Sequence, residues 1–259
     1  MASITVLDSA SVRRALDIRD LTDPGQGRHA MQLLVNEIER ALSELWNLPL
    51  RRHRVNPVVP AEDNYDRLRY GPDAVARDTR YTRYLSPDLV LRTHSSAMIP
   101  PLLTRLSESP RVEVLLSCPG IVYRRDAIDR THTGEPHQID LWRIRPGEPA
   151  LDVSDLEEMI GSVVEAALPG YSYRTLPTEH PYTLEGREIE IRDGGRWLEI
   201  GECGLAHPEV LGSGGLSKTS SGLAMGLGLD RLVMVRKGLG RHPSLAGERS
   251  AHCLADARP

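Results

Sequence analysis

The chain has 259 residues, of which 40% are hydrophobic, so it can form one large core or at most two small ones. Charges of both signs make up 26% of the residues and the formal net charge is −4, which excludes a global positive field for nucleic acid or membranes. Charged residues interrupt every apolar stretch of the first twenty positions, so we expect no signal peptide, no membrane span and a cytoplasmic location.

The first third of the chain predicts a helix followed by a strand. Apolar residues recur at intervals of three and four between Met31 and Leu45, as in an amphipathic helix. Residues 54–60 predict a strand that ends in prolines, because proline cannot donate a backbone hydrogen bond to a neighbouring strand. Residues 64–86 show no clear period and are predicted to be irregular.

The middle of the chain predicts several strands. Val112, Val114 and Leu116 alternate with other residues, which is typical of a strand. Residues 121–123 and 139–144 predict two more strands, joined by a polar loop over residues 125–136. These segments are expected to form an antiparallel pair with a long connection.

The last hundred residues predict a helix, a hairpin and a final strand that leads into a short helix. Ser154 and Glu157 have the spacing of a capping box at the start of the helix. Asp193-Gly194-Gly195 favours a hairpin turn between two apolar segments, and residues 222–229 form a glycine-spaced strand before the short helix. Strands that follow one another mostly without helices predict an α+β fold with an antiparallel β-sheet flanked by helices, and not a doubly wound parallel sheet.

A first group of polar residues surrounds Arg124. An arginine held on a strand can bind a phosphate through two parallel hydrogen bonds, and Asp126 two positions later points the same way. That carboxylate could accept from an exocyclic amine such as that of adenine. The loop with His132 follows, and His137-Gln138-Ile139-Asp140 returns on the next strand. Taken alone, such a run is more often a solvated salt-bridge cluster than a functional site.

A second group lies at the glycine-spaced strand. Gly222, Gly226 and Gly228 would let a ligand lie flat on the strand, and Arg231 in the following helix could reach a terminal phosphate. A dinucleotide-binding fingerprint is disfavoured, because the segment has no third glycine at the required spacing and no parallel βαβ unit surrounds it. Tight packing of a helix against the glycine face is the structural alternative.

A third group contains two carboxylates, Glu199 and Glu202, in the segment that runs to Pro208. Beside a phosphate site they could share Mg²⁺, which prefers oxygen ligands and keeps waters and substrate phosphates in its coordination shell. An exposed acidic edge is the alternative interpretation.

In this order the pieces resemble the three motifs of class II aminoacyl-tRNA synthetases. The chain resembles in particular the phenylalanyl-tRNA synthetase alpha subunit, as a stand-alone relative, over roughly residues 28–239. The matching segments are residues 92–96 (Arg-Thr-His-Ser-Ser), 120–126 with Thr131-His132 and His137-Gln138, 197–208, and 221–231.

The resemblance implies an enzyme that activates an amino acid as its adenylate, with ATP and Mg²⁺ as cofactors. It implies that Arg124 grips the ATP α-phosphate and Arg231 the γ-phosphate, as the two catalytic residues. The other ATP positions are Asp126, His132, Gly226 and Gly228, the metal positions are Glu199 and Glu202, and the positions near the backbone of the amino acid are His94, Ser96, Gln138 and Asp140, the last in place of a glutamate.

Two further positions concern the side chain of the amino acid substrate. Under this resemblance Leu223 and Met225 stand where the phenylalanine enzyme carries two phenylalanines that grip the substrate ring. A ring pair contributes only about 0.5–1.5 kcal/mol beyond burial, so their replacement does not exclude phenylalanine. We expect a changed or relaxed specificity.

Three functions remain open at this point. The activated amino acid could pass to a carrier protein, a small molecule or a protein side chain; it could pass to the acceptor end of tRNA; or the chain could be a non-catalytic paralogue that binds an amino acid or nucleotide. The resemblance also implies a homodimer through the first helix and strand. We expect residues 1–28 to form an arm, 29–239 the catalytic domain, and 240–259 an atypical, poorly ordered tail.

Overall fold

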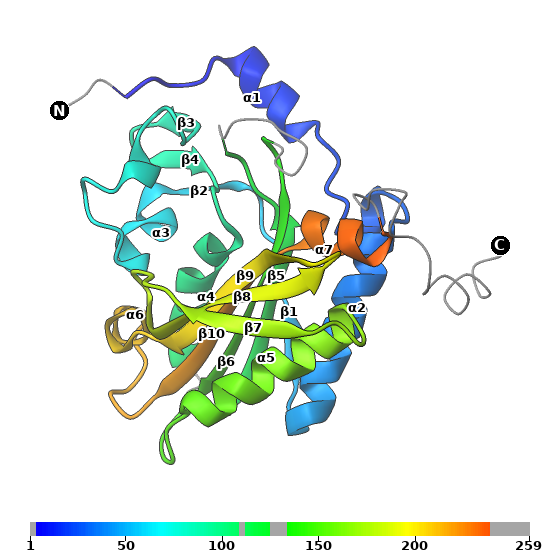
Figure 1. The fold of residues 1–259 in the computed structure, drawn as a ribbon. Coiled ribbons are helices and arrows are strands. Elements are labelled where there is room, and N and C mark those ends of the chain that lie inside the picture. The colour runs from blue at the N-terminus through cyan, green and yellow to red at the C-terminus, as the bar shows by residue number, and fades with distance from the viewer. Residues whose placement is uncertain (1–3, 109–111, 125–133, 239–259) are drawn as a thin grey trace.

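A computed structural model describes residues 4–108, 112–124 and 134–238, and its largest element is a twisted β-sheet (Figure 1). Among these residues the sheet has seven strands, all antiparallel to their neighbours except the parallel pair β1 and β5. This confirms the predicted α+β class. In spatial order the strands are β1 (Leu50–Arg52), β5 (Val114–Ile121), β6 (His137–Arg145), β10 (Ser221–Gly228), β9 (Arg196–Ala206), β8 (Thr183–Asp193) and β7 (Tyr173–Pro177).

Two long helices, α2 (Ala30–Trp46) and α5 (Val153–Ala167), pack side by side over one face of this sheet (Figure 1). The short helix α7 (Leu229–Arg236) contacts α2 and β6 at the end of β10. The largest hydrophobic core lies between these helices and the sheet, and includes Leu34, Ile38, Leu141, Ile160, Met225 and Leu232. The predicted first helix is confirmed, and burial of its apolar stripe is the main reason that it is stable.

A smaller layer covers part of the opposite face of the sheet. It holds a second core, in which Met98 and Leu102 pack against Trp142 and Ala224. Its elements are β2 (Val58–Pro60), β4 (Leu89–Leu91), β3 (Tyr84–Ser86), α3 (Ala61–Asn64), α4 (Ile99–Ser107), α6 (Pro208–Ser213), and the short 3₁₀ helices η2 (Asp66–Leu68), η3 (Val75–Arg77) and η4 (Ser95–Met98).

The strand predicted over residues 54–60 is confirmed only for its last three residues, which form β2 and end in Pro60. The chain forms β1 at the edge of the large sheet, leaves it after His53 donates to the Ser117 carbonyl, and enters the small sheet at β2. Asn56 accepts a hydrogen bond from the amide of Val58 at 2.9 Å and so organises the bend before β2. The two strands predicted around residues 112–123 are one strand, β5, which is buried along its whole length.

Local turns account for the ends of the later elements. Helix α5 begins with a capping box between Asp152 and Asp155, not between Ser154 and Glu157, because Asp152 accepts from two amides of the first turn. The predicted hairpin is confirmed: Asp193 pairs with Arg196, and Gly194 and Gly195 have φ of 56° and 88°. Two successive positive φ angles define the tight turn that hairpins favour and that glycine permits.

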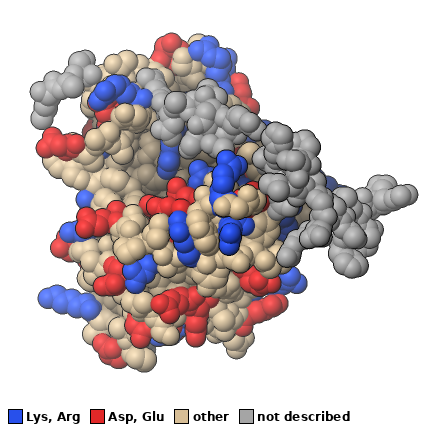
Figure 2. Space-filling view, in the orientation of Figure 1, with Lys and Arg blue, Asp and Glu red and all other residues tan. Residues whose placement is uncertain are grey.

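The N-terminal segment contains α1 (Ser9–Leu16) and η1 (Pro24–Gln26) and lies against the sheet. Ala15 packs in a cluster with Leu91 and Ile121, and the amide of Leu21 donates to His137 Nε2 at 3.0 Å. Within the described part of the chain, no helix combines the length and apolar character needed to cross a membrane. Basic and acidic side chains are interspersed over the visible face (Figure 2). The tail predicted at residues 240–259 lies outside the described residues.

Candidate active site

A cavity of about 390 Å³ opens on the face of the sheet opposite the long helices, at the start of β6, the middle of β9 and the end of β10. Polar residues from several distant segments of the sequence meet in it. The predicted site residues that line it are His94, Ser96, Arg124, Gln138, Asp140, Glu199, Glu202, Gly226, Gly228 and Arg231.

Strand register explains why these residues meet. Gly226 of β10 pairs with Asp140 of β6 on one side and with Glu202 of β9 on the other, and Gly228 pairs with Gln138. Directly opposed residues on neighbouring strands have side chains on the same face. A glycine between the two carboxylates therefore leaves an open floor, flanked by Asp140 and Glu202.

Arg124 stands just beyond the end of β5, on the side of the cavity that faces the small layer. Its Nε donates to the Thr93 carbonyl at 2.8 Å, and its backbone amide donates to the Gly134 carbonyl at 2.8 Å. These bonds fix the direction of the guanidinium from both ends of the residue. A guanidinium fixed in this way can bind a phosphate with little loss of side-chain entropy.

Arg231 lies in the first turn of α7, at the more open end of the cavity. Its Nη1 donates to the Glu199 carbonyl oxygen and lies 3.6 Å from the Glu199 carboxylate. The neighbouring Asp230 accepts from the backbone amide of His137 at 2.5 Å and contacts its Nδ1 at 3.3 Å. The start of α7 is thereby tied to β9 and β6, which holds Arg231 at the cavity.

Asp140 is the most buried carboxylate of the cavity, with 2% of its surface exposed. Its oxygens accept from Ser95 Oγ at 2.7 Å, Ser96 Oγ at 3.0 Å and Trp142 Nε1 at 3.0 Å. Burial raises its pKa, while these three donors act in the opposite direction. A buried carboxylate next to an open glycine floor suits an ammonium ligand, which would compensate its lost hydration.

Glu199 and Glu202 lie on β9 on either side of Gly201, and Glu188 of β8 pairs with Glu202. Burial raises the pKa of Glu202, and the charges of Glu199 and Glu188 add to the effect. Among the described residues, no group of three or more histidine, cysteine or acidic side chains has the geometry of a complete metal site. Carboxylate oxygens are the ligands that Mg²⁺ prefers, and this cation commonly takes its remaining ligands from water and phosphate.

Aromatic rings surround the inner end of the cavity, and sequence reasoning missed most of them. Tyr70 stacks on His94 at 5.5 Å between ring centroids, and His180 meets Tyr182 edge to face at 4.1 Å. Tyr182 also stacks on Trp142 at 6.0 Å. Tyr70 comes from a stretch without periodicity, and His180 and Tyr182 both come just before β8. The residues carry no local signal for a site, because only the tertiary fold brings them together.

The two histidines of this wall are neutral at physiological pH. Burial lowers the pKa of His94 to about 3 and that of His180 to about 4, and the nearby positive charge of Arg124 contributes to both shifts. Both ring nitrogens of His94 and the Nδ1 of His180 are buried without a hydrogen-bond partner. Buried polar atoms normally have partners, so these nitrogens indicate a place for a ligand or water.

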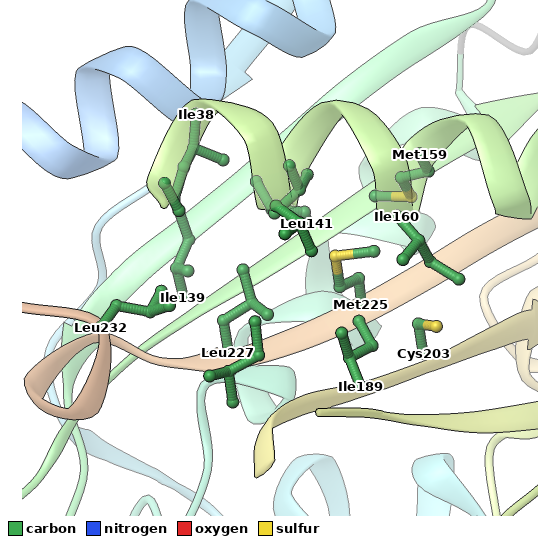
Figure 3. Packing of buried hydrophobic residues seen from close by; sticks show 14 of the residues in the cluster. Ile38, Ile139, Leu141, Met159, Ile160, Ile189, Cys203, Met225, Leu227 and Leu232 are labelled. Atoms are coloured by element: carbon green, nitrogen blue, oxygen red, sulfur yellow. The ribbon is translucent and has the colours of Figure 1, made fainter. Parts of the chain in front are cut away.

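Leu223 and Met225 do not line the cavity, so the prediction that they contact the amino acid is wrong. They are 0% and 1% exposed and belong to the core beneath the long helices. Figure 3 shows Met225 pointing toward Met159 and Ile160 of α5. Side chains alternate along a strand, so residues that share a face with Gly226 must lie an even number of positions away. The odd positions 223 and 225 face the helices instead.

Asp126 and His132, predicted to contact ATP, lie outside the described residues. Their roles stay predictions.

Comparison with known proteins gives a consistent assignment. The family model described as tRNA synthetases class II core domain (F) matches residues 18–241. The phenylalanine–tRNA ligase alpha subunit of Prochlorococcus marinus (strain NATL2A) is 37% identical over 177 residues, covering 68% of this chain and 51% of that protein. The same subunit from Nostoc sp. (strain PCC 7120) is 33% identical over 236 residues, covering 88% and 69%. The chain thus spans about half to two thirds of these relatives.

Among solved structures, pyrrolysyl-tRNA synthetase from Desulfitobacterium hafniense is similar with a TM-score of 0.61 and 17% identity, covering 88% of this chain and 76% of that one. At this identity the likeness concerns the fold alone. It agrees with the mostly antiparallel sheet and flanking helices described above.

Proposed function

Because the chain belongs to the class II tRNA synthetase core-domain family, we propose that it activates an amino acid with ATP, forming an aminoacyl adenylate and pyrophosphate. The observation that carries this proposal is that Arg124 and Arg231 line one cavity together with Asp140 and the two glutamates of β9. Two guanidinium groups on one cavity suit a bent triphosphate, and the buried carboxylate between them and the inner wall suits an α-ammonium group.

In this reaction an oxygen of the amino acid carboxylate attacks the α-phosphorus of ATP. A carboxylate oxygen–phosphorus bond forms, and the bond from that phosphorus to the bridging oxygen breaks, so that pyrophosphate leaves with the electron pair. No general base is needed, because the nucleophile is already ionised. Arg124 would neutralise charge on the α-phosphate and Arg231 on the γ-phosphate, while Asp140 and Ser96 orient the amino group.

The family uses Mg²⁺, and Glu199 and Glu202 are the residues that would hold it here. A bound divalent cation neutralises phosphate charge and helps to orient the leaving group. The raised pKa of Glu202 fits this role, since crowded carboxylates next to one another are stabilised by a cation. The acidic pair would also position Arg231 through the contact with Glu199.

The acceptor of the activated amino acid is a separate part of the proposal. We propose transfer to the acceptor end of tRNA or to a carrier protein. Among the described residues of the face in Figure 2, basic and acidic side chains are mixed, and we propose that the acceptor makes a small contact near the cavity. Incubation of the protein with ATP, radiolabelled amino acid and either total tRNA or carrier protein separates the two, because only the true acceptor becomes labelled.

ATP–pyrophosphate exchange measured separately with each of the twenty amino acids tests the activation step. We expect amino acid-dependent exchange with at least one of them. A protein that binds ATP and an amino acid in calorimetry, yet shows no exchange with Mg²⁺ present, would instead be a non-catalytic paralogue.

We also propose self-association through α2 and the edge strand β1. Leu33 and Leu45 of α2 are 63% and 42% exposed, although the rest of the apolar stripe is buried. Light scattering coupled to gel filtration should give twice the chain mass, and Leu33→Glu should give the monomer mass without loss of helical circular dichroism.

A further inference from the structure

The geometry points to the side chain that this site selects: we propose that the amino acid substrate carries an aromatic ring with a hydrogen-bonding group on it, not a plain hydrocarbon side chain. This inference rests on the proposed function and deepens it. It comes from the inner wall of the cavity, formed by Tyr70, His94, His180 and Tyr182.

The cavity has two ends that differ in exposure. At the outer end the side chains of Glu199 and Asp230 are 46% and 33% exposed, and Arg231 is 23% exposed. At the inner end Asp140 is 2% exposed, His94 is 9% exposed and the His180 side chain is 21% exposed. A hydrated triphosphate suits the outer end. The amino acid, whose ammonium group suits Asp140, therefore extends its side chain toward the inner end.

The inner wall is aromatic in shape. Tyr70 and His180 meet edge to face at 5.8 Å between centroids, and Tyr70 and Tyr182 lie 6.4 Å apart. These distances show that the rings pack on one another, and the surface that they leave toward the cavity is aromatic. A planar side chain could lie against that surface, because aromatic pairs favour centroid distances of about 4.5–7 Å. A planar ring can therefore contact several of these residues at once.

The same wall is polar in chemistry. A neutral imidazole carries one N–H donor and one lone-pair acceptor, and neither ring nitrogen of His94 has a partner with normal hydrogen-bond geometry, although the backbone of Asn64 is close enough to influence its pKa. His180 Nδ1 is likewise without a partner, while its Nε2 lies 3.4 Å from the Tyr70 hydroxyl and 3.7 Å from the Glu202 carboxylate. A hydrocarbon ring placed here would displace water and leave these buried polar atoms unpaired, which is unfavourable.

The tyrosine hydroxyl of the wall is connected to the amino-group site. Tyr182 Oη lies 3.1 Å from Ser96 Oγ, which in turn donates to Asp140 at 3.0 Å. Burial raises the pKa of Tyr182 well above its usual value, so its hydroxyl stays protonated. This chain of hydrogen bonds fixes Tyr182, and with it the position of the neighbouring ring of His180. The wall is therefore a fixed arrangement and not an adaptable apolar pocket.

Matched substrates that differ by one polar atom test the proposal in ATP–pyrophosphate exchange. The pairs are phenylalanine against tyrosine, and phenylalanine against 2-, 3- and 4-pyridylalanine, which have nearly the same shape. We expect kcat/KM for the best polar ring to exceed that for phenylalanine by about 100-fold, as expected when two buried groups gain partners. Equal or higher kcat/KM with phenylalanine or leucine than with every polar ring would overturn the proposal.

Variants then locate the contact. His180→Phe should bring the ratio between polar ring and phenylalanine close to one through a higher KM for the polar amino acid, with the KM for ATP unchanged. His180→Gln, which keeps a donor and an acceptor, should retain part of the preference. Tyr81→Phe, an aromatic substitution outside the cavity, should leave the ratio unchanged. A rise in the KM for ATP alone would assign the imidazole to the nucleotide and overturn the inference.

Calorimetric titration of each amino acid without ATP separates this inference from the proposed function. Binding of a polar aromatic amino acid without any exchange would refute activation and keep the side-chain assignment. Exchange with leucine or phenylalanine alone would support activation and refute the side-chain assignment. If none of the tested amino acids binds or exchanges, both proposals are wrong.

Discussion

The two faces of strand β10 have different roles: one lines the cavity and the other packs in the core. On the face toward the cavity, positions 224, 226 and 228 are alanine and glycines, and the open floor lies between Asp140 and Glu202. On the face toward the helices, Leu223, Met225 and Leu227 are fully buried in the large core. One strand thus offers backbone and space on one side and apolar volume on the other.

This contrast shows that a sequence motif can carry two kinds of information in alternate residues. The glycines matter because they lack a side chain where a ligand would lie. The leucines and Met225 matter because they bury apolar area against α2 and α5. Substitutions on the two faces should therefore separate activity from stability.

The largest effect is expected from the arginines at the edge of the cavity face. Arg124→Ala and Arg231→Ala should each lower the rate of ATP–pyrophosphate exchange roughly 10²–10³-fold, because a fixed group that stabilises transition-state charge is lost. Thermal unfolding should change little. Arg196→Ala, in the exposed hairpin, is the matched control and should exchange at the parental rate. A loss below threefold in both cavity variants would exclude phosphate binding as their main role.

On the helix face, Met225→Ala should destabilise the fold by about 2–5 kcal/mol, the usual cost of removing a buried methionine side chain. Urea unfolding followed by circular dichroism measures this. In ATP–pyrophosphate exchange at a temperature where the variant is folded, its KM for the amino acid should stay within about threefold of the parental KM. A large change in that KM, with unaltered stability, would mean that Met225 contacts the substrate after all.

The adjacent residue should behave in the opposite way. A Cβ at Gly226 would lie 3.5 Å from Asp140 Oδ2, which is an ordinary contact, so the fold should tolerate Gly226→Ala. The methyl group would nevertheless occupy the floor on which the ammonium group is proposed to lie. We expect roughly a tenfold higher KM for the amino acid, or about 1.4 kcal/mol, and an unchanged midpoint in urea. A KM equal to that of the parent would indicate that the amino acid does not lie on β10.

Much of this fold could be predicted from local patterns. The helical period of α2, the Gly194-Gly195 turn and the glycine strand before α7 each follow from short-range rules and are confirmed. The segment at residues 54–60 could not be predicted, because its chain leaves one sheet and joins another, and the partners of both short strands are distant in the sequence.

The site shows the same division. Arg124, Glu202 and Gly226 carried motif signals, and the structure brings them to one cavity. His180 and Tyr182 carried none, because their role depends on contacts with Tyr70 and Ser96, which lie 110 and 86 positions earlier in the sequence. The wrong assignment of Leu223 and Met225 had a different cause: strand alternation already placed them on the face opposite Gly226.

The smallest expected effect is the loss of folding stability at acid pH that is caused by His94 on the cavity face. His94 has a pKa near 3 in the folded protein against 6.5 for a free histidine, so between these values the unfolded chain binds more protons. The stability associated with neutral His94 is therefore complete above pH 6.5 and is lost progressively as the pH falls toward 3.

We expect the parent to lose about 1 kcal/mol more than His94→Gln between pH 6.5 and 5.5, since a shift of one pKa unit corresponds to roughly 1.4 kcal/mol and the unfolded histidine is only partly protonated at the start. Urea unfolding at both pH values measures the difference. Asp140 and Glu202, whose raised pKa values act in the opposite direction, are present in both proteins and cancel in the comparison. Met225→Ala should lower the free energy of unfolding by the same amount at both pH values, because the helix face contains no titrating group at that position. An identical pH dependence in the parent and His94→Gln would show that His94 is hydrated in solution, and would remove the stability cost assigned to the cavity face.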